Sequence, residues 1–333
     1  METKAKYYEI KQDNKIKCLL CPVGCLLGEG KEGVCMGRYN KDGEMVVTNY
    51  GEAVSLSIDP IEKKPLYHFH PRSLILSTGP NGCNLRCKNC QNWNISQEKS
   101  PTGYVSPERM AELSTQNDSI GIAYTYTEPF MWFEYLCDTM PLVHQAGGKN
   151  VMVTNGYINR EPLEELLPLI DAMNVDLKSM DDDFYRRICK GHLKEVQETI
   201  TRAFESDVHL EVTSLLISDL NDSREHVTRL VDWIASVSPE IPLHISRYFP
   251  SYKMDRPITP IESLDMAYRI AIRKLDYVYV GNTHIEGTTD TLCPKCGETL
   301  ISRNGYQTEV KRLKGAECGN CGAKINLVLH SSK

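Results

Sequence analysis

All but two of the 13 cysteines fall into three sets whose close spacing is typical of metal binding. The sets are Cys18, Cys21, Cys25 and Cys35; Cys83, Cys87 and Cys90; and Cys293, Cys296, Cys318 and Cys321. The N-terminus has no apolar signal segment, so we expect a cytoplasmic protein whose thiols stay reduced. Closely spaced thiols in such a protein indicate zinc or iron–sulfur ligation. Cys137 and Cys189 stand alone, and we expect them to have no function.

The middle set forms a CxxxCxxC motif over residues 83–90. Three thiolates in one short loop would hold three irons of a [4Fe–4S] cluster and leave the fourth iron open to nitrogen and oxygen ligands. The alternative is a zinc site in which His68 or His70 supplies the fourth ligand.

The C-terminal set consists of two knuckles, in each of which a glycine follows the second cysteine. Four thiolates at tetrahedral reach predict a structural zinc ribbon, with iron in a rubredoxin-like centre as the alternative. For the N-terminal set the spacing leaves three possibilities open, namely zinc, a second [4Fe–4S] cluster and a redox-inactive fold staple.

The composition is that of a globular protein: of 333 residues, 41% are hydrophobic and 25% are charged. The net charge of −6 argues against binding to nucleic acid. The sequence has no apolar run of about 18 residues, so we predict no membrane span.

Residues 71–288 alternate between short apolar runs and helical patterns. The predicted helices cover Pro129–Ala146, Glu161–Ile170, Ser223–Ser236 and Pro260–Lys274, and Ser106-Pro107-Glu108 opens another. The predicted strands are Leu74–Ser77, Gly121–Thr125, Asn150–Thr154, Ala172–Leu177, His209–Leu216, Leu243–Tyr248 and Tyr277–Val280.

This alternation predicts an α/β fold with parallel strands, either a doubly wound sheet or a partial or full (β/α) barrel. In each case ligands would bind at the carboxyl ends of the strands. We expect three parts, a Cys-rich N-terminal metal-binding region (1–70), the barrel (71–288) and a zinc-ribbon-like C-terminal domain (289–333).

The CxxxCxxC motif after the first strand of such a series resembles the radical SAM superfamily. The resemblance implies a [4Fe–4S] cluster on Cys83, Cys87 and Cys90. The open iron would bind S-adenosylmethionine (SAM), which one-electron reduction cleaves to a 5′-deoxyadenosyl radical that abstracts hydrogen from a substrate.

The resemblance also implies SAM contacts after the later strands. Tyr126-Thr127-Glu128-Pro129 stands where the superfamily usually has Gly-Gly-Glu; the acid is kept and both glycines are missing. The other implied contacts are Thr154, Asn155, Asp176, Lys178 and His244. Asn89 replaces the usual aromatic residue before the third cysteine, and Trp93 is a nearby candidate for stacking.

Over nearly the whole chain, the sequence is similar to the AmmeMemoRadiSam system radical SAM enzymes, relatives of the pyruvate formate-lyase activating enzymes. The similarity rests on motifs such as Asp59-Pro60-Ile61-Glu62-Lys63-Lys64, Cys90-Gln91-Asn92-Trp93 and Arg247-Tyr248-Phe249-Pro250. It implies Memo-like and AMMECR-type partners and an electron donor such as ferredoxin or flavodoxin. The substrate stays open between a small molecule or partner protein and, alternatively, a glycyl radical protein. A third reading is a non-catalytic metal-binding interaction protein.

Overall fold

A computed structural model describes residues 3–329, and a sheet of eight strands lies at its centre. The strand order is β16-β15-β14-β13-β12-β11-β9-β8. The strands are β8 (Leu56–Pro60), β9 (Leu74–Thr78), β11 (Ser119–Tyr124), β12 (Lys149–Thr154), β13 (Ala172–Asp176), β14 (His209–Leu216), β15 (Leu243–Arg247) and β16 (Val278–Gly281). All seven predicted strands are confirmed.

The seven strands from β9 to β16 run parallel, and β8 joins the edge antiparallel to β9. In the described chain β16 and β8 each pair on one side only, so the α/β sheet is open, as in the partial-barrel form of our prediction. Because β9 to β16 are parallel, their carboxyl ends lie along one edge of the sheet.

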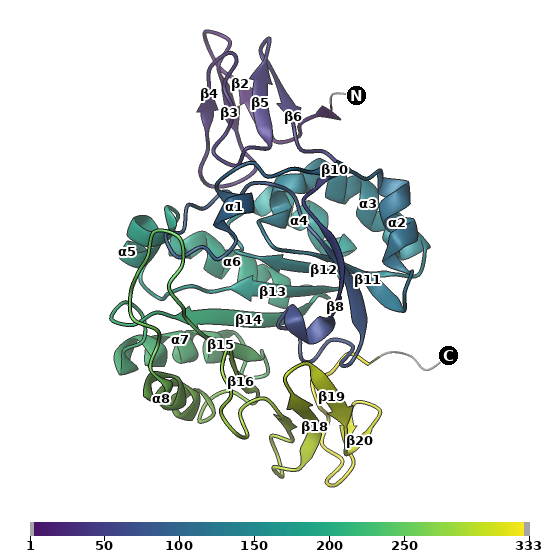
Figure 1. The fold of residues 1–333 in the computed structure, drawn as a ribbon, viewed down its shortest axis with the longest axis vertical. Helices are drawn as coiled ribbons and strands as arrows, with labels where there is room; N and C mark the ends of the chain where they lie inside the picture. Colours follow the sequence, from purple (N-terminus) through teal and green to yellow (C-terminus); the bar gives the residue numbers. More distant parts are fainter. Residues whose placement is uncertain (1–2, 330–333) are drawn as a thin grey trace.

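Helices connect the parallel strands and cover the outer face of the sheet (Figure 1). They are α2 (Pro107–Ser114), α3 (Phe133–Gln145), α4 (Arg160–Leu166), α6 (Leu193–Phe204), α7 (Arg224–Val237) and α8 (Ile261–Ala271). The Ser106 and Ser223 side chains cap α2 and α7 by accepting backbone N–H bonds. Covered on both faces, the strands are almost entirely buried, as the pattern of β14 shows.

Two features of the barrel were not predicted. Helix α6 buries Val196, Thr199, Ile200 and Ala203 along one face, a helical pattern that we did not assign from the sequence. Strand β8 comes from the segment that we assigned to the N-terminal region, and it extends the sheet by pairing with β9. The division at residues 71 and 288 therefore stays a prediction.

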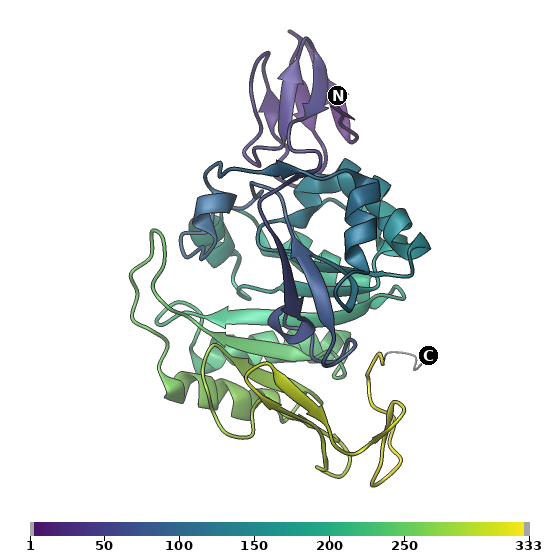
Figure 2. The same ribbon diagram turned by 45° about the vertical axis from the view of Figure 1, so that its right-hand side comes forward.

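The two outer parts lie at opposite ends of the molecule (Figures 1 and 2). The N-terminal part has two antiparallel sheets, and a third small pair joins β7 (Glu52–Ala53) to β10 (Gly103–Tyr104). The N-terminal sheets contain β1 (Thr3–Lys4), β5 (Arg38–Lys41) and β6 (Glu44–Val47), and β2 (Tyr8–Ile10), β3 (Ile16–Cys18) and β4 (Leu26–Leu27). The C-terminal part contains β17 (Thr291–Leu292), β18 (Thr299–Asn304), β19 (Gln307–Val310), β20 (Leu313–Lys314) and β21 (Glu317–Cys318).

A buried ion pair fastens the N-terminal part to the barrel. Arg38 on β5 donates to Glu134 on α3 at 2.7 Å, and the two side chains are only 2% and 6% exposed. The backbone N–H of Lys6 donates to the same carboxylate oxygen at 2.7 Å. Over residues 3–329, no helix combines the length and the apolar character needed to cross a bilayer.

Candidate active site

A cavity of about 500 Å³ lies at the carboxyl ends of the parallel strands. This volume falls within the range of about 300–1,000 Å³ that small-molecule sites occupy. Its lining includes Cys83, Cys87, Cys90, Glu128, Thr154, Asn155, Asp176 and Lys178. The structure therefore brings together the three cysteines of the central motif and five of the six residues that the resemblance pointed to.

The cysteine loop (residues 83–90) is held in place by a segment far away in sequence. The N–H groups of Arg86 and Lys88 donate to the carbonyls of Cys189 and Ile188 at 2.8 and 3.1 Å. Those carbonyls lie at the end of a single π-helical turn, η4 (Tyr185–Cys189), after β13. Backbone bonds of this kind fix the loop relative to the sheet whatever its side chains bind.

The three thiols of the loop differ in their surroundings. Burial raises the pKa of Cys83 and Cys90, although Cys83 accepts the N–H of Leu85 and Cys90 lies 3.1 Å from the Ser96 hydroxyl. A hydrogen bond from Cys189 lowers the pKa of Cys87. Cys189, which we expected to have no role, is thus a neighbour of the motif that its position in the sequence did not reveal.

Glu128 organises the loop that follows β12. Its carboxylate accepts the Thr154 hydroxyl at 2.7 Å and the Asn155 N–H at 2.8 Å. Asn155 in turn donates through Nδ2 to Asn84 Oδ1 at 3.0 Å and to Cys83 Sγ at 3.5 Å. Burial raises the pKa of Glu128 to about 7, while the bonds from Asn155 and Thr154 oppose the rise. One acid therefore links the motif after β11 to the cysteine loop.

Asp176 and Lys178 form an ion pair at the end of β13, with Oδ2 and Nζ 2.8 Å apart. Burial alone would lower the pKa of Lys178, but Asp176 and the nearby Cys87 raise it well above its usual value. The Lys178 N–H also donates to Tyr185 at 3.0 Å. The pair presents one fixed positive and one fixed negative charge to the cavity.

Tyr126 takes up the backbone conformation that the missing glycine would adopt freely. Its φ is +72°, which costs a non-glycine residue about 1–3 kcal/mol. The Tyr126 hydroxyl donates to Asp59 at 3.0 Å, and Lys64 Nζ lies 4.8 Å from the ring centroid. Asp59 also binds Lys63 and Lys64. The Asp59–Lys64 motif thus holds Tyr126 in place, a contact between distant segments that sequence reasoning missed.

His244 does not line the cavity, so the structure does not support its predicted contact with SAM. It lies near the start of β15, at the opposite end of the barrel, where Nε2 is 2.6 Å from Glu211. His68 is also far from the cysteine loop, because its ring bonds to the Asn326 carbonyl and the Tyr279 hydroxyl. Neither His68 nor His70 is part of the cavity lining, which removes both proposed fourth ligands for a central zinc.

Two residues near the loop face different surroundings. Trp93 stacks on Tyr252 with ring centroids 5.4 Å apart, so one face of the Trp93 ring packs against Tyr252. Asn89 lines the cavity, and its Oδ1 is buried without a hydrogen-bond partner.

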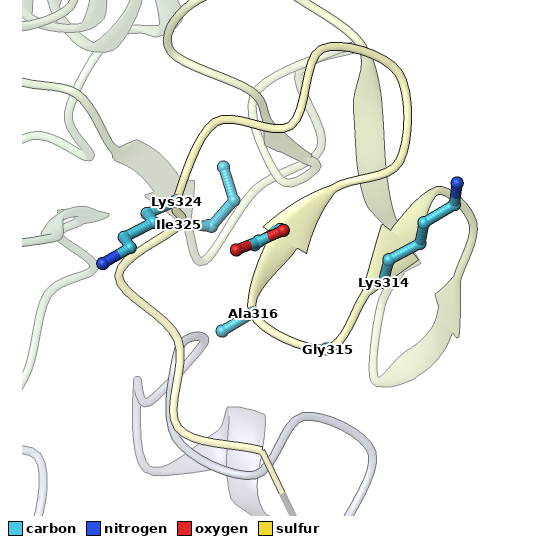
Figure 3. Close-up of a pocket in the computed structure, with 6 residues that line it drawn as sticks. Lys314, Gly315, Ala316, Lys324 and Ile325 are labelled. Atoms are coloured by element: carbon cyan, nitrogen blue, oxygen red, sulfur yellow. The ribbon is translucent and has the colours of Figure 1, made fainter.

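The C-terminal cysteines form a compact site. Cys293 Sγ lies 3.6 Å from Cys321 Sγ, and Cys296 Sγ lies 3.7 Å from Cys318 Sγ. A tetrahedral metal with bonds of about 2.3 Å to sulfur places its ligands about 3.8 Å apart, so the spacing fits one ion. A second hollow of about 490 Å³ lies beside this site, between the turn at Gly315 and Ile325 (Figure 3), and contains no residue that we predicted for chemistry.

The donors of the main cavity fit a group bound through three sulfurs. In the part of the chain that the structure describes, its lining has three cysteines from one loop and no histidine or further cysteine. The unpartnered Asn89 oxygen and the Asp176–Lys178 pair add the polar groups that a charged small molecule needs. The cavity therefore suits an iron–sulfur cluster that keeps one open iron beside SAM.

Comparisons with known proteins agree with this geometry. Residues 78–234 match the family described as the Radical SAM superfamily. A Methanocaldococcus jannaschii protein named MJ0808, described as uncharacterized, is 41% identical over 98% of this chain and 99% of its own length. The pyruvate formate-lyase-activating enzyme of Clostridium pasteurianum is 27% identical over 58% of this chain and 86% of that enzyme.

Among solved structures, Streptococcus suis SuiB bound to S-adenosylmethionine is similar, with a TM-score of 0.50 and 14% identity. The similarity covers 65% of this chain and 50% of SuiB. At this level of identity the likeness concerns the fold alone.

Proposed function

Because the chain belongs to the radical SAM superfamily, whose members are enzymes, we propose that it cleaves SAM reductively at the cavity of residues 83–90. Cys83, Cys87 and Cys90 would hold a [4Fe–4S] cluster. The observation that carries the proposal is the convergence of these three thiols with Glu128 and Lys178 on one cavity. Because members of this superfamily are enzymes, we no longer consider a non-catalytic metal-binding interaction protein.

The bound cluster and SAM would supply a 5′-deoxyadenosyl radical through one-electron reduction of the sulfonium. The chain's own residues position the reactants. Glu128 holds the Thr154 hydroxyl and the Asn155 N–H, so that the Asn155 amide reaches Cys83. The Asp176–Lys178 pair offers opposite charges to the ribose or to the charged amino-acid part of SAM.

We assign the chain to the AmmeMemoRadiSam system as part of the same proposal, on its sequence motifs. One motif has a structural role, since Asp59 and Lys64 hold Tyr126 at the cavity. This assignment implies Memo-like and AMMECR-type partner proteins, ferredoxin or flavodoxin as the electron donor, and a cytoplasmic location. The substrate would be a small molecule or a partner protein.

The C-terminal quartet would bind a structural zinc ion. Its four sulfurs all lie within 4.8 Å of one another, which leaves no open position for chemistry. The site packs at the opposite end of the barrel from the cavity, where His68 bonds to Asn326 and Arg303 bonds to the Tyr67 carbonyl.

Similarity to the Clostridium pasteurianum enzyme favours a second candidate, activation of a glycyl radical protein. The two candidates differ in which molecule loses the hydrogen. With deuterated candidate substrates, deuterium should appear in 5′-deoxyadenosine only for the true substrate, whether small molecule or protein backbone.

The experiment that tests SAM cleavage uses anaerobically reconstituted protein with dithionite. The wild type should form 5′-deoxyadenosine, and Cys87→Ala should abolish that product. Cys137→Ala is the matched control, because Cys137 lies on α3 and its thiol contacts Glu165 rather than the cavity. Product formation by Cys87→Ala at the wild-type rate would show that the loop does not hold the cluster.

A further inference from the structure

The two outer cysteine sets differ in where they lie relative to the cavity. The N-terminal quartet (Cys18, Cys21, Cys25 and Cys35) lies at the carboxyl ends of the strands, next to the cysteine loop. Figure 1 shows β2 to β6 standing over α1 (Trp93–Ser96), the short helix that follows this loop. The C-terminal quartet packs instead against the opposite end of the barrel. Only the N-terminal set is therefore placed to act on the chemistry.

The N-terminal quartet and the cysteine loop are in direct contact. A Cβ atom built on Gly82 would meet the Cys35 carbonyl oxygen at 1.9 Å, so the two backbones touch one residue before Cys83. The Arg86 guanidinium also donates to the Val34 carbonyl.

A second contact joins the quartet to the loop after β12. Asn159 donates from Nδ2 to the Leu19 carbonyl at 2.6 Å and from its backbone N–H to the Leu20 carbonyl at 3.1 Å. These carbonyls lie in the turn between Cys18 and Cys21. The same β12 loop carries Asn155, which reaches Cys83, so this loop contacts both the quartet and the cysteine loop.

Three of the four N-terminal thiols are buried, and the fourth, that of Cys25, is partly buried. Cys18, Cys21 and Cys35 are 6–7% exposed, and Cys21 interacts electrostatically with the other three. The sulfurs of Cys25 and Cys35 both lie within 3.9 Å of the point where a Gly33 Cβ would sit.

Backbone amides are aimed at these sulfurs. The backbone N–H groups of Leu20, Val23 and Gly37 interact electrostatically with the thiols two residues earlier in the chain, at Cys18, Cys21 and Cys35. The same arrangement occurs in the cysteine loop, where the N–H of Leu85 meets Cys83.

The N-terminal sulfurs are gathered less closely than those of the C-terminal quartet. Over the described residues, the ligand atoms of the C-terminal quartet gather within 4.8 Å of one another, whereas neither the N-terminal quartet nor the cysteine loop forms such a group. A cubane holds each thiolate on a separate iron, so its sulfurs stand farther apart than those around a single ion.

We propose, resting on the SAM cleavage argued above, that Cys18, Cys21, Cys25 and Cys35 bind a second [4Fe–4S] cluster that relays electrons to the first. A reduced ferredoxin or flavodoxin gives one electron to the N-terminal cluster. That cluster returns to its oxidised state as the electron passes across the Cys35–Gly82 contact, and the cluster of the cysteine loop is reduced by one electron. Each SAM cleaved oxidises one equivalent of donor. Because all four irons have cysteine ligands, the N-terminal cluster transfers electrons and binds no substrate.

The first experiment removes the cysteine loop as a ligand. The triple variant Cys83→Ala, Cys87→Ala and Cys90→Ala, reconstituted anaerobically, should keep about four irons and four sulfides per chain and give a reduced-cluster signal in electron paramagnetic resonance. A second zinc ion per chain, in addition to the one expected at the C-terminal quartet, and no iron would overturn the proposal. If the triple variant binds no iron but the wild type cleaves SAM, the second cluster and the relay are refuted and the proposed function stands. If the wild type cleaves no SAM, the proposed function is refuted.

The second experiment tests the relay in the variant Cys18→Ser/Cys21→Ser. Its rate of SAM cleavage is compared with reduced flavodoxin and with dithionite, a small reductant that reaches the cysteine loop directly. The ratio of the flavodoxin-driven to the dithionite-driven rate should fall at least tenfold, and it should stay unchanged in Cys137→Ala. An unchanged ratio in the double variant would refute the relay. The iron content of the triple variant shows whether the N-terminal quartet binds a cluster, even if Cys18→Ser/Cys21→Ser does not fold.

Discussion

Replacement of Gly82 by alanine tests the contact between the N-terminal quartet and the cysteine loop. Gly82 has a φ of +98°, and its added Cβ would lie 1.9 Å from the Cys35 carbonyl oxygen. Because real Cβ contacts do not fall below 3.0 Å, the two segments would have to separate by about 1.1 Å, the difference between these distances.

Two costs combine in Gly82→Ala, and a matched variant separates them. The positive φ costs a residue with a Cβ about 1–3 kcal/mol, and the overlap costs about 1–3 kcal/mol more. Gly147→Ala carries the first cost alone, because its φ is +81° and nothing lies within 4 Å of the new Cβ. We therefore expect Gly82→Ala to lose about 1–3 kcal/mol more free energy of unfolding than Gly147→Ala.

The assay is urea unfolding of both variants and the wild type under anaerobic conditions, followed by the ratio of flavodoxin-driven to dithionite-driven SAM cleavage. Gly82→Ala should lower that ratio because it opens the gap at Cys35, and Gly147→Ala should leave it alone. Equal losses of stability and equal ratios in the two variants would refute the contact.

Three further predictions concern stability. Arg38→Met leaves the buried Glu134 carboxylate without its cationic partner and should lower the free energy of unfolding in urea by about 3–5 kcal/mol. The double variant Arg38→Met/Glu134→Met should restore most of this loss, and a single variant as stable as the wild type would contradict the prediction. Burial lowers the pKa of His68 to about 3, so below pH 6.5 the unfolded chain binds one proton more than the folded chain. Its contribution to the free energy of unfolding should fall by about 1.4 kcal/mol per unit as the pH drops from 6.5 toward 4, a slope that His68→Gln should remove. Cys318→Ser should release zinc and expose residues 289–333 to protease, and zinc retained at the wild-type level would count against the ribbon.

The sequence alone was sufficient for features that depend on local spacing. The interval between Cys83, Cys87 and Cys90 places three thiols in one loop whatever the rest of the chain does. The alternation of apolar runs and helical stripes predicts parallel strands, because each strand must be buried on both faces and each helix must cover it. Because parallel strands end along one edge, the same pattern also predicts that Glu128 and Lys178 lie near the loop.

The tertiary structure decided which distant segments meet. His244 looked like a residue of the cavity, but its place at the start of β15 turns it toward Glu211 at the other end of the barrel. Tyr126 keeps a positive φ because β8 supplies Asp59, a partner that no local pattern indicates. The spacing of the two outer cysteine quartets also did not show that only the N-terminal one touches the cysteine loop. Chain connectivity determines what lies within a loop, whereas packing between segments determines which side chains share a site.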